Sequence, residues 1–114
     1  MKIYLAHPYG GDEYNIERAG ILARELEKTY PTWTVVSPLH LFSWKPYEKD
    51  HYMAQMWKCL EVMLACDALY LADGWEMSLG CRMEKAVAED RGMPVYWKGH
   101  EGKWSIVRRV LEGL

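Results

Sequence analysis

Short apolar segments alternate with longer amphipathic segments along the chain. Four of the apolar segments have the length and composition of buried strands: residues 2–7, 33–37, 67–73 and 94–97. Apolar residues recur at helical spacing in the stretches that begin near Asp12, Asp50 and Ser78, and Ser105 can cap a last short helix. The segment from Pro38 to Lys49 is rich in proline and aromatic residues and is expected to be a loop.

This alternation of strands and helices predicts a single α/β domain over residues 1–114. The expected fold is a flavodoxin-like or Rossmann-like parallel sheet of about four strands in the order 2-1-3-4, with helices on both faces. Because that order reverses between the first and third strands, a ligand should bind beyond their carboxyl ends. Those ends are His7 to Gly11 and Asp73 to Gly80, so the two segments are expected to meet.

The segment from Ser78 to Ala88 is the clearest candidate for chemistry. Ser78 can cap the helix, and the free N–H groups of a helix start favour an anion such as phosphate. Gly80, Glu84 and Ala88 have the spacing of one helix face, which sets a carboxylate between two small residues. A carboxylate in this position, beside an anion site, is a candidate nucleophile or base for a phosphorylated substrate. A surface glutamate and a plain N-cap are the structural alternatives for Glu84 and Ser78.

Three segments together resemble the nucleoside 2-deoxyribosyltransferase superfamily: Tyr4-Leu5-Ala6-His7-Pro8 with Gly10-Gly11, Cys66-Asp67-Ala68, and Ser78-x-Gly80-x-x-x-Glu84-x-x-x-Ala88. The resemblance is closer to the 2'-deoxynucleoside 5'-monophosphate N-glycosidases, and to short, often phage-encoded relatives, than to the transferases. It implies cleavage of the N-glycosidic bond of a nucleotide or nucleoside through a covalent glycosyl-glutamate intermediate, with hydrolysis favoured over base transfer. It implies no cofactor.

The resemblance also assigns most of the site residues. Tyr4 matches the tyrosine that helps to place the nucleophile, which is Glu84 here. Ser78 and Gly80 match the residues that hold the phosphate. The turn at Gly10-Gly11 matches the loop that closes around the sugar phosphate.

The acid that assists departure of the base is not assigned by the resemblance. The family's aspartate falls near Cys59 here, and a thiol is no substitute for a carboxylic acid at neutral pH. Asp67, Asp73 or a carboxylate of a neighbouring subunit are the candidates in its place. His7 stands where many relatives have glycine and is expected beside the sugar.

Aromatic and apolar side chains suggest a lid and a subunit contact. Trp44, in the Pro38–Lys49 loop, and Trp75, before the Ser78 helix, are expected to stack on a base. The long loop is a candidate lid over that base. The methionine and tryptophan stripe that includes Met53 and Trp57 is expected to form core or a subunit contact, which favours a homo-oligomer.

Composition narrows the function classes further. A chain of 114 residues with a formal net charge of −2 is typical of a soluble globular protein and argues against binding polymeric nucleic acid. The apolar runs are too short for a membrane span and no signal pattern precedes the first strand, so a cytoplasmic location is expected. The three cysteines and four histidines lack metal-ligand spacing, so no metal is expected. The alternative function is a non-catalytic nucleotide- or nucleotide-signal-binding protein on the same fold, or an interaction module with an aromatic surface.

Overall fold

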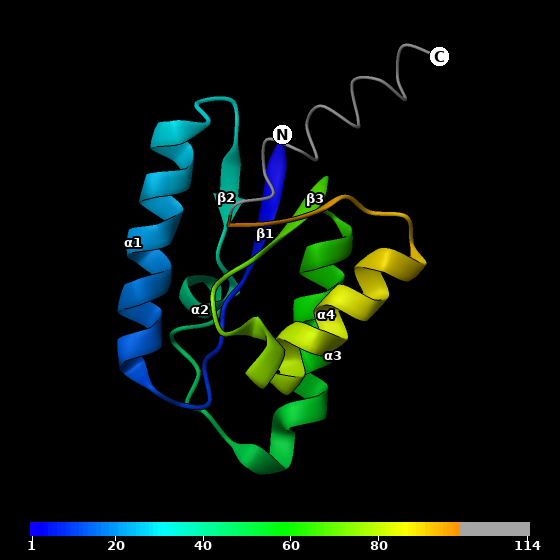
Figure 1. The fold of residues 1–114 in the computed structure, drawn as a ribbon. Coiled ribbons are helices and arrows are strands. Elements are labelled where there is room, and N and C mark those ends of the chain that lie inside the picture. The colour runs from blue at the N-terminus through cyan, green and yellow to red at the C-terminus, as the bar shows by residue number, and fades with distance from the viewer. Residues whose placement is uncertain (99–114) are drawn as a thin grey trace.

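Four parallel strands form the sheet in the computed structural model, which describes residues 1–98 (Figure 1). The strands are β1 (Lys2–Ala6), β2 (Thr34–Val36), β3 (Ala68–Leu71) and β4 (Val95–Trp97). Their order is β2-β1-β3-β4 and every neighbouring pair is parallel, which confirms the predicted α/β, flavodoxin-like arrangement. The short helix expected after Ser105 lies outside the described residues.

The helices are α1 (Glu13–Thr29), α2 (Pro38–Leu41), α3 (Tyr52–Leu64) and α4 (Leu79–Asp90), with single 3-10 turns at Lys49–His51 and Trp75–Met77. The predicted caps of α1 and α4 are confirmed. The Asp12 carboxylate accepts a hydrogen bond from the Tyr14 amide at 2.9 Å, and the Ser78 hydroxyl accepts one from the Cys81 amide at 3.3 Å. The expected loop at residues 38–49 begins instead with the short α2, because the fixed φ of a proline suits the first turn of a helix.

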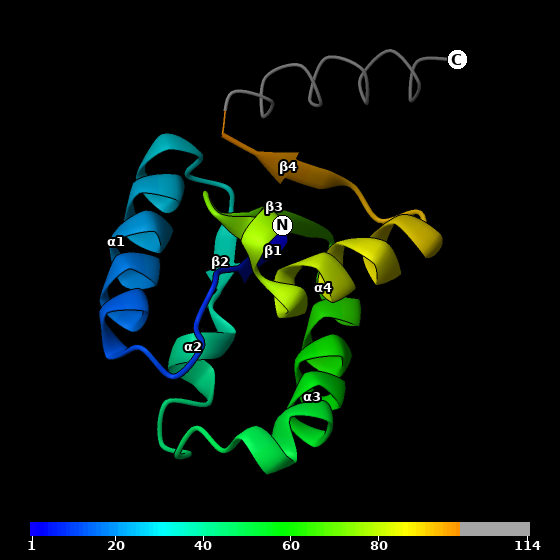
Figure 2. The same ribbon diagram turned by 60° about the horizontal axis from the view of Figure 1, so that its bottom comes forward.

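The helices cover both faces of the sheet, as Figure 2 shows for α1 on one side and for α3 and α4 on the other. Side chains alternate along each strand, so Ile3 and Leu5 pack in the cluster that contains Ala19 of α1. Tyr4 and Ala6 point to the other face, where Leu60 and Met63 of α3 and Cys81 and Ala88 of α4 complete a second cluster. The alternation therefore directs Tyr4 toward the face on which α4 carries Glu84.

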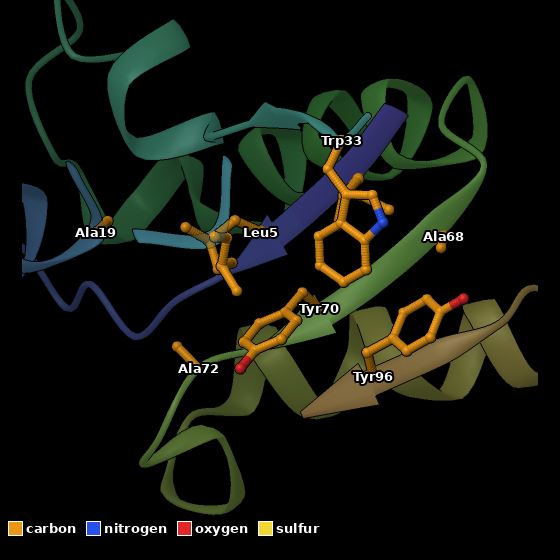
Figure 3. Close-up of a cluster of buried hydrophobic side chains, with 9 residues drawn as sticks. Leu5, Ala19, Trp33, Ala68, Tyr70, Ala72 and Tyr96 are labelled. Atoms are coloured by element: carbon orange, nitrogen blue, oxygen red, sulfur yellow. The ribbon is translucent and has the colours of Figure 1, made fainter. Parts of the chain in front are cut away.

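Aromatic rings fill the α1 side of the sheet (Figure 3). The Trp33 ring lies 5.4 Å from that of Tyr96 and 6.4 Å from that of Tyr70, measured between centroids. These three aromatic residues are therefore part of the core. Within residues 1–98, no helix combines the length and the apolar character that crossing a membrane requires.

Candidate active site

A cavity of about 410 Å³ lies beyond the carboxyl end of β1. Its walls come from the segment after β1, from α2 and the residues that follow it, from α3, and from the start of α4. The volume is within the range of small-molecule sites. The two segments predicted to meet do so here, and six of the predicted site residues line the cavity: Tyr4, His7, Gly10, Ser78, Gly80 and Glu84.

Glu84 is the buried carboxyl of this cavity, with an exposed fraction of 6%. It shares its helix face with the buried residues Cys81 and Ala88, which pack on the sheet, so the surface alternative for Glu84 is wrong. Burial raises the pKa of Glu84 to about 7, and the Tyr4 hydroxyl opposes that rise only in part. The carboxyl therefore titrates near neutral pH, which is the range that a nucleophile or an acid–base group needs.

The Tyr4 side chain is fully buried, and its hydroxyl lies beside Glu84 and Cys59. Burial, reinforced by the negative charge of Glu84, raises the pKa of Tyr4 well above its ordinary value, so the phenol keeps its proton. The hydroxyl nevertheless has no hydrogen bond of normal geometry to any described residue. An unpaired buried hydroxyl costs about 1–3 kcal/mol. It is thus a donor available to Glu84 or to a ligand in the cavity.

The start of α4 forms another wall of the cavity, through Ser78 and Gly80. A Cβ atom on Gly80 would lie 3.0 Å from the Tyr52 hydroxyl oxygen and 3.4 Å from the Met56 sulfur. Glycine at this position therefore lets the start of α4 approach α3 closely. The start of α4 thus borders the cavity, and the partial positive charge of a helix start suits an anionic group of a ligand.

The two glycines after β1 differ in their surroundings. Gly10 lines the cavity, and both residues have positive φ, of 60° and 82°. Gly11 does not line it, but a Cβ atom there would lie 2.9 Å from Cδ1 of Tyr47. The Tyr9 and Tyr47 rings also meet edge to face at 5.5 Å. Because Gly11 has no Cβ atom, this turn can pack closely against Tyr47 in the segment after α2.

His7 is half-buried in the cavity wall, and its Nδ1 lies 2.8 Å from the Pro8 carbonyl oxygen. Burial is the main cause that lowers the pKa of His7. The neutral ring donates Nδ1–H to that carbonyl, because a carbonyl oxygen only accepts. Nε2 is then left as an acceptor.

Besides Gly11, four predicted site residues do not line the cavity. Asp67 lies just before β3, where its Oδ2 accepts a hydrogen bond from the Lys2 amide at 2.7 Å, so it is at the amino end of the strands and the cavity is beyond their carboxyl ends. Asp73 is exposed at the other end of that strand. Trp44 is 76% exposed, with the Lys45 ammonium 5.1 Å from its ring, and Trp75 packs against the core cluster of α3 and α4.

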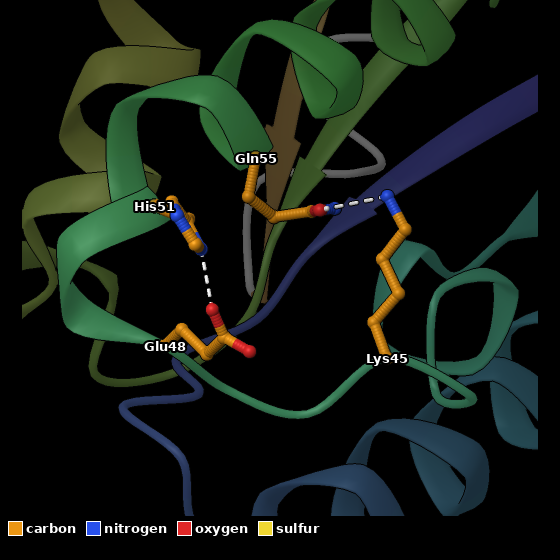
Figure 4. A network of polar contacts seen from close by, with 4 residues as sticks. All are labelled: Lys45, Glu48, His51 and Gln55. Carbon is orange, nitrogen blue, oxygen red and sulfur yellow. Dashed lines mark hydrogen bonds and ion pairs between the residues drawn. The ribbon is translucent and has the colours of Figure 1, made fainter.

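Several polar residues of the cavity wall carried no role in the sequence analysis (Figure 4). The Lys45 ammonium donates to Gln55 Oε1 at 3.2 Å, and Gln55 Nε2 points to the Cys59 sulfur at 3.8 Å. His51 pairs with Glu48 nearer the N-terminal end of α3. The polar residues Gln55 and Lys58 of α3 were visible in the sequence, but only the packing shows that they border a cavity, together with Met56.

Comparisons with known proteins identify the family and go no further. No curated protein and no solved structure matches the chain. One family of domains, described as a domain of unknown function (DUF4406), matches residues 1–97, which include every strand and helix given above. The chain therefore belongs to the DUF4406 family.

Proposed function

We propose that the protein cleaves the N-glycosidic bond of a nucleoside 5'-monophosphate or nucleoside, with Glu84 as the nucleophile. One observation carries the proposal: a carboxyl buried in a ligand-sized cavity, with a pKa of about 7, beside an unpaired tyrosine hydroxyl and a helix start. The resemblance to the nucleoside 2-deoxyribosyltransferase superfamily rests on these same residues, Tyr4, Ser78, Gly80 and Glu84. Hydrolysis is favoured over base transfer.

In the proposed reaction, ionised Glu84 attacks the anomeric carbon as the bond to the base breaks through an oxocarbenium-like transition state. The Tyr4 hydroxyl donates to the carboxylate and holds it toward the sugar. Water then attacks the anomeric carbon and Glu84 is released as a carboxylate; the proton that this water loses balances the one that the departing base takes up. Only carboxyl chemistry and water are needed, so the proposal requires no cofactor.

The substrate is proposed to be anionic at its sugar end. Ser78 and Gly80 at the start of α4 line the cavity, and the free amides of a helix start suit a 5'-phosphate. Gly10 lines the cavity near the same end. The apolar and aromatic residues after α2, including Phe42 and Tyr47, line the remaining wall and suit a base.

The homo-oligomer stays a prediction. It rests on the outer face of α3, where Met53 and Trp57 are 55% and 66% exposed, while Met56, Leu60 and Met63 of the same stripe are buried. The stripe is thus core on one side and unpartnered within residues 1–98 on the other.

The test is chromatographic detection of free base from ribo- and deoxyribonucleosides and their 5'-monophosphates. Wild type should release base, and Glu84→Gln should reduce the rate by at least about a thousandfold, because the amide cannot form the glycosyl ester. Glu25→Gln, which changes an exposed glutamate of α1 outside the cavity, is the matched control and should keep the wild-type rate. An active Glu84→Gln protein would exclude the mechanism.

The alternative is a nucleotide-binding protein without turnover. One observation favours it: Asp67 and Asp73, the two carboxylates predicted as the acid, lie outside the cavity, while Cys59 lines it. Such a protein would release no base, yet a nucleotide at about 100 times its dissociation constant would raise the free energy of unfolding by about 2.7 kcal/mol. A thermal melting series with the same compounds distinguishes the two functions.

A further inference from the structure

Two lysines line the cavity without a carboxylate partner. Lys45 comes from the segment after α2 and Lys58 from α3, and neither forms an ion pair with any residue among 1–98. The Lys45 ammonium instead donates to the neutral Gln55 amide at 3.2 Å (Figure 4). The adjacent Lys58 ammonium is the main cause that lowers the pKa of Lys45. Two neighbouring cations without a counter-ion repel each other, and negative charge on a bound ligand would relieve that repulsion.

The lysines line the same cavity as Glu84, and Cys59 lines it too. The Cys59 thiol is beside the Tyr4 hydroxyl and within the electrostatic influence of Glu84 and of Lys45. Because α3 rises about 1.5 Å per residue, Gln55 and Lys58 lie within about one turn of Cys59. The His51–Glu48 pair lies about two turns, or roughly 12 Å, further along the axis. Gln55, which accepts from Lys45, and Lys58 therefore lie nearer to Cys59 along α3 than the His51–Glu48 pair does.

We infer that Lys45 and Lys58 form a cationic subsite for the departing base, and that Lys45 gives this base its proton. The inference rests on the proposed function, since it assigns the acid of that reaction. As Glu84 bonds to the anomeric carbon, the bond to the base breaks and its electron pair goes to the base nitrogen. The Lys45 ammonium transfers a proton there, which leaves a neutral base and a neutral amine. Water then attacks the anomeric carbon, Glu84 leaves as a carboxylate, and the proton of that water returns to Lys45.

The other candidates for the acid are less suitable. Asp67 and Asp73 do not line the cavity. Burial and the negative charge of Glu84 raise the pKa of the Cys59 thiol, because losing its proton would leave a thiolate near that carboxylate, whereas an ammonium that loses its proton becomes neutral. A lysine beside a second cation is a better acid than an isolated one. The titratable groups that line the cavity with Lys45 come from every wall: Tyr4, His7, Tyr9, Tyr47, Glu48, His51, Tyr52, Lys58, Cys59, Cys81 and Glu84.

The experiment compares two leaving groups in single-turnover base release. The substrates are a guanine nucleoside 5'-monophosphate and its N7-methyl counterpart, whose base is already cationic and leaves as a neutral molecule without a proton. Lys45→Met should slow release of guanine by about 100-fold or more and release of N7-methylguanine by less than about 3-fold. Lys28→Met, at an exposed position of α1 outside the cavity, should leave both rates unchanged.

A second measurement does not depend on the base. With the best wild-type substrate, Lys58→Met should move the alkaline limb of the rate profile to higher pH, because removing the neighbouring positive charge raises the pKa of Lys45. Equal slowing of both guanine substrates by Lys45→Met, or an unmoved limb in Lys58→Met, would overturn the proton donation. In both cases the proposed function would still hold if wild type releases base and Glu84→Gln does not. Wild type that releases no base from any substrate would instead remove the proposed function, and this inference with it.

Discussion

Replacing Glu84 by glutamine should change how stability depends on pH. The pKa of Glu84 rises from an ordinary value of 4.5 to about 7 in the folded protein, because the carboxyl is buried. Between these two values the unfolded chain has lost the proton and the folded chain retains it. The free energy of unfolding then falls by about 1.4 kcal/mol per pH unit. Glutamine has nearly the same shape and does not titrate.

The magnitude follows from the two pKa values. Stability is fully present below pH 4.5 and is lost as pH rises to about 7, by roughly 3 kcal/mol in total. Glu84→Gln lacks this loss. The difference in unfolding free energy between variant and wild type should therefore shift by roughly 3 kcal/mol in favour of the variant between pH 4.5 and pH 8.

Urea denaturation of both proteins at pH 4.5, 6, 7 and 8 measures this shift. Comparing the two proteins cancels the titration of all other groups, provided that the slopes with urea agree. Glu25→Gln is the control for an exposed glutamate and should track wild type at every pH. A difference in unfolding free energy between Glu84→Gln and wild type that stays constant from pH 4.5 to 8 would refute the raised pKa of Glu84. It would also refute the inference that Glu84 titrates near neutral pH.

Two further substitutions test individual placements. Ser78→Ala removes the cap of α4 and should lower the free energy of unfolding, measured by chemical denaturation, by about 1 kcal/mol. It should weaken the binding of 5'-monophosphates far more than that of nucleosides. Equal losses for both would exclude a phosphate-binding role of Ser78. Asp67→Ala removes the acceptor of the Lys2 amide at 2.7 Å and should also cost about 1 kcal/mol, while base release stays within about twofold of wild type. A loss of base release by two orders of magnitude in Asp67→Ala would return that residue to the role of the acid.

The pattern of apolar residues was sufficient to predict the strands, the three longer helices and the order of the sheet. These features depend on local periodicity and on the right-handed crossovers of parallel strands, which leave few alternatives. The cap at Ser78 and the shared face of Gly80 and Glu84 are local for the same reason, since three or four residues fix a helix face. The convergence of the His7 and Ser78 segments followed from the strand order alone.

Other features depend on distances that no local pattern contains. Asp67 and Asp73 flank the same strand and were equal candidates in the sequence, but one bonds to the Lys2 amide at the amino end of the sheet and the other is exposed. Lys45 and Lys58 come from separate segments, and only the packing of the post-α2 segment against α3 places both in one wall. Gly11 was assigned to the sugar phosphate, yet it lies against Tyr47.

The sequence by itself therefore determined which elements form, how they are ordered and which face of α4 carries the carboxyl. Only the tertiary structure decided that Glu84 titrates near neutral pH, that the Tyr4 hydroxyl has no hydrogen bond of normal geometry to a described residue, and that two lysines line one cavity without an ion pair among residues 1–98. The physical reason is that a pKa depends on desolvation and on nearby charges, and residues distant in the sequence supply both.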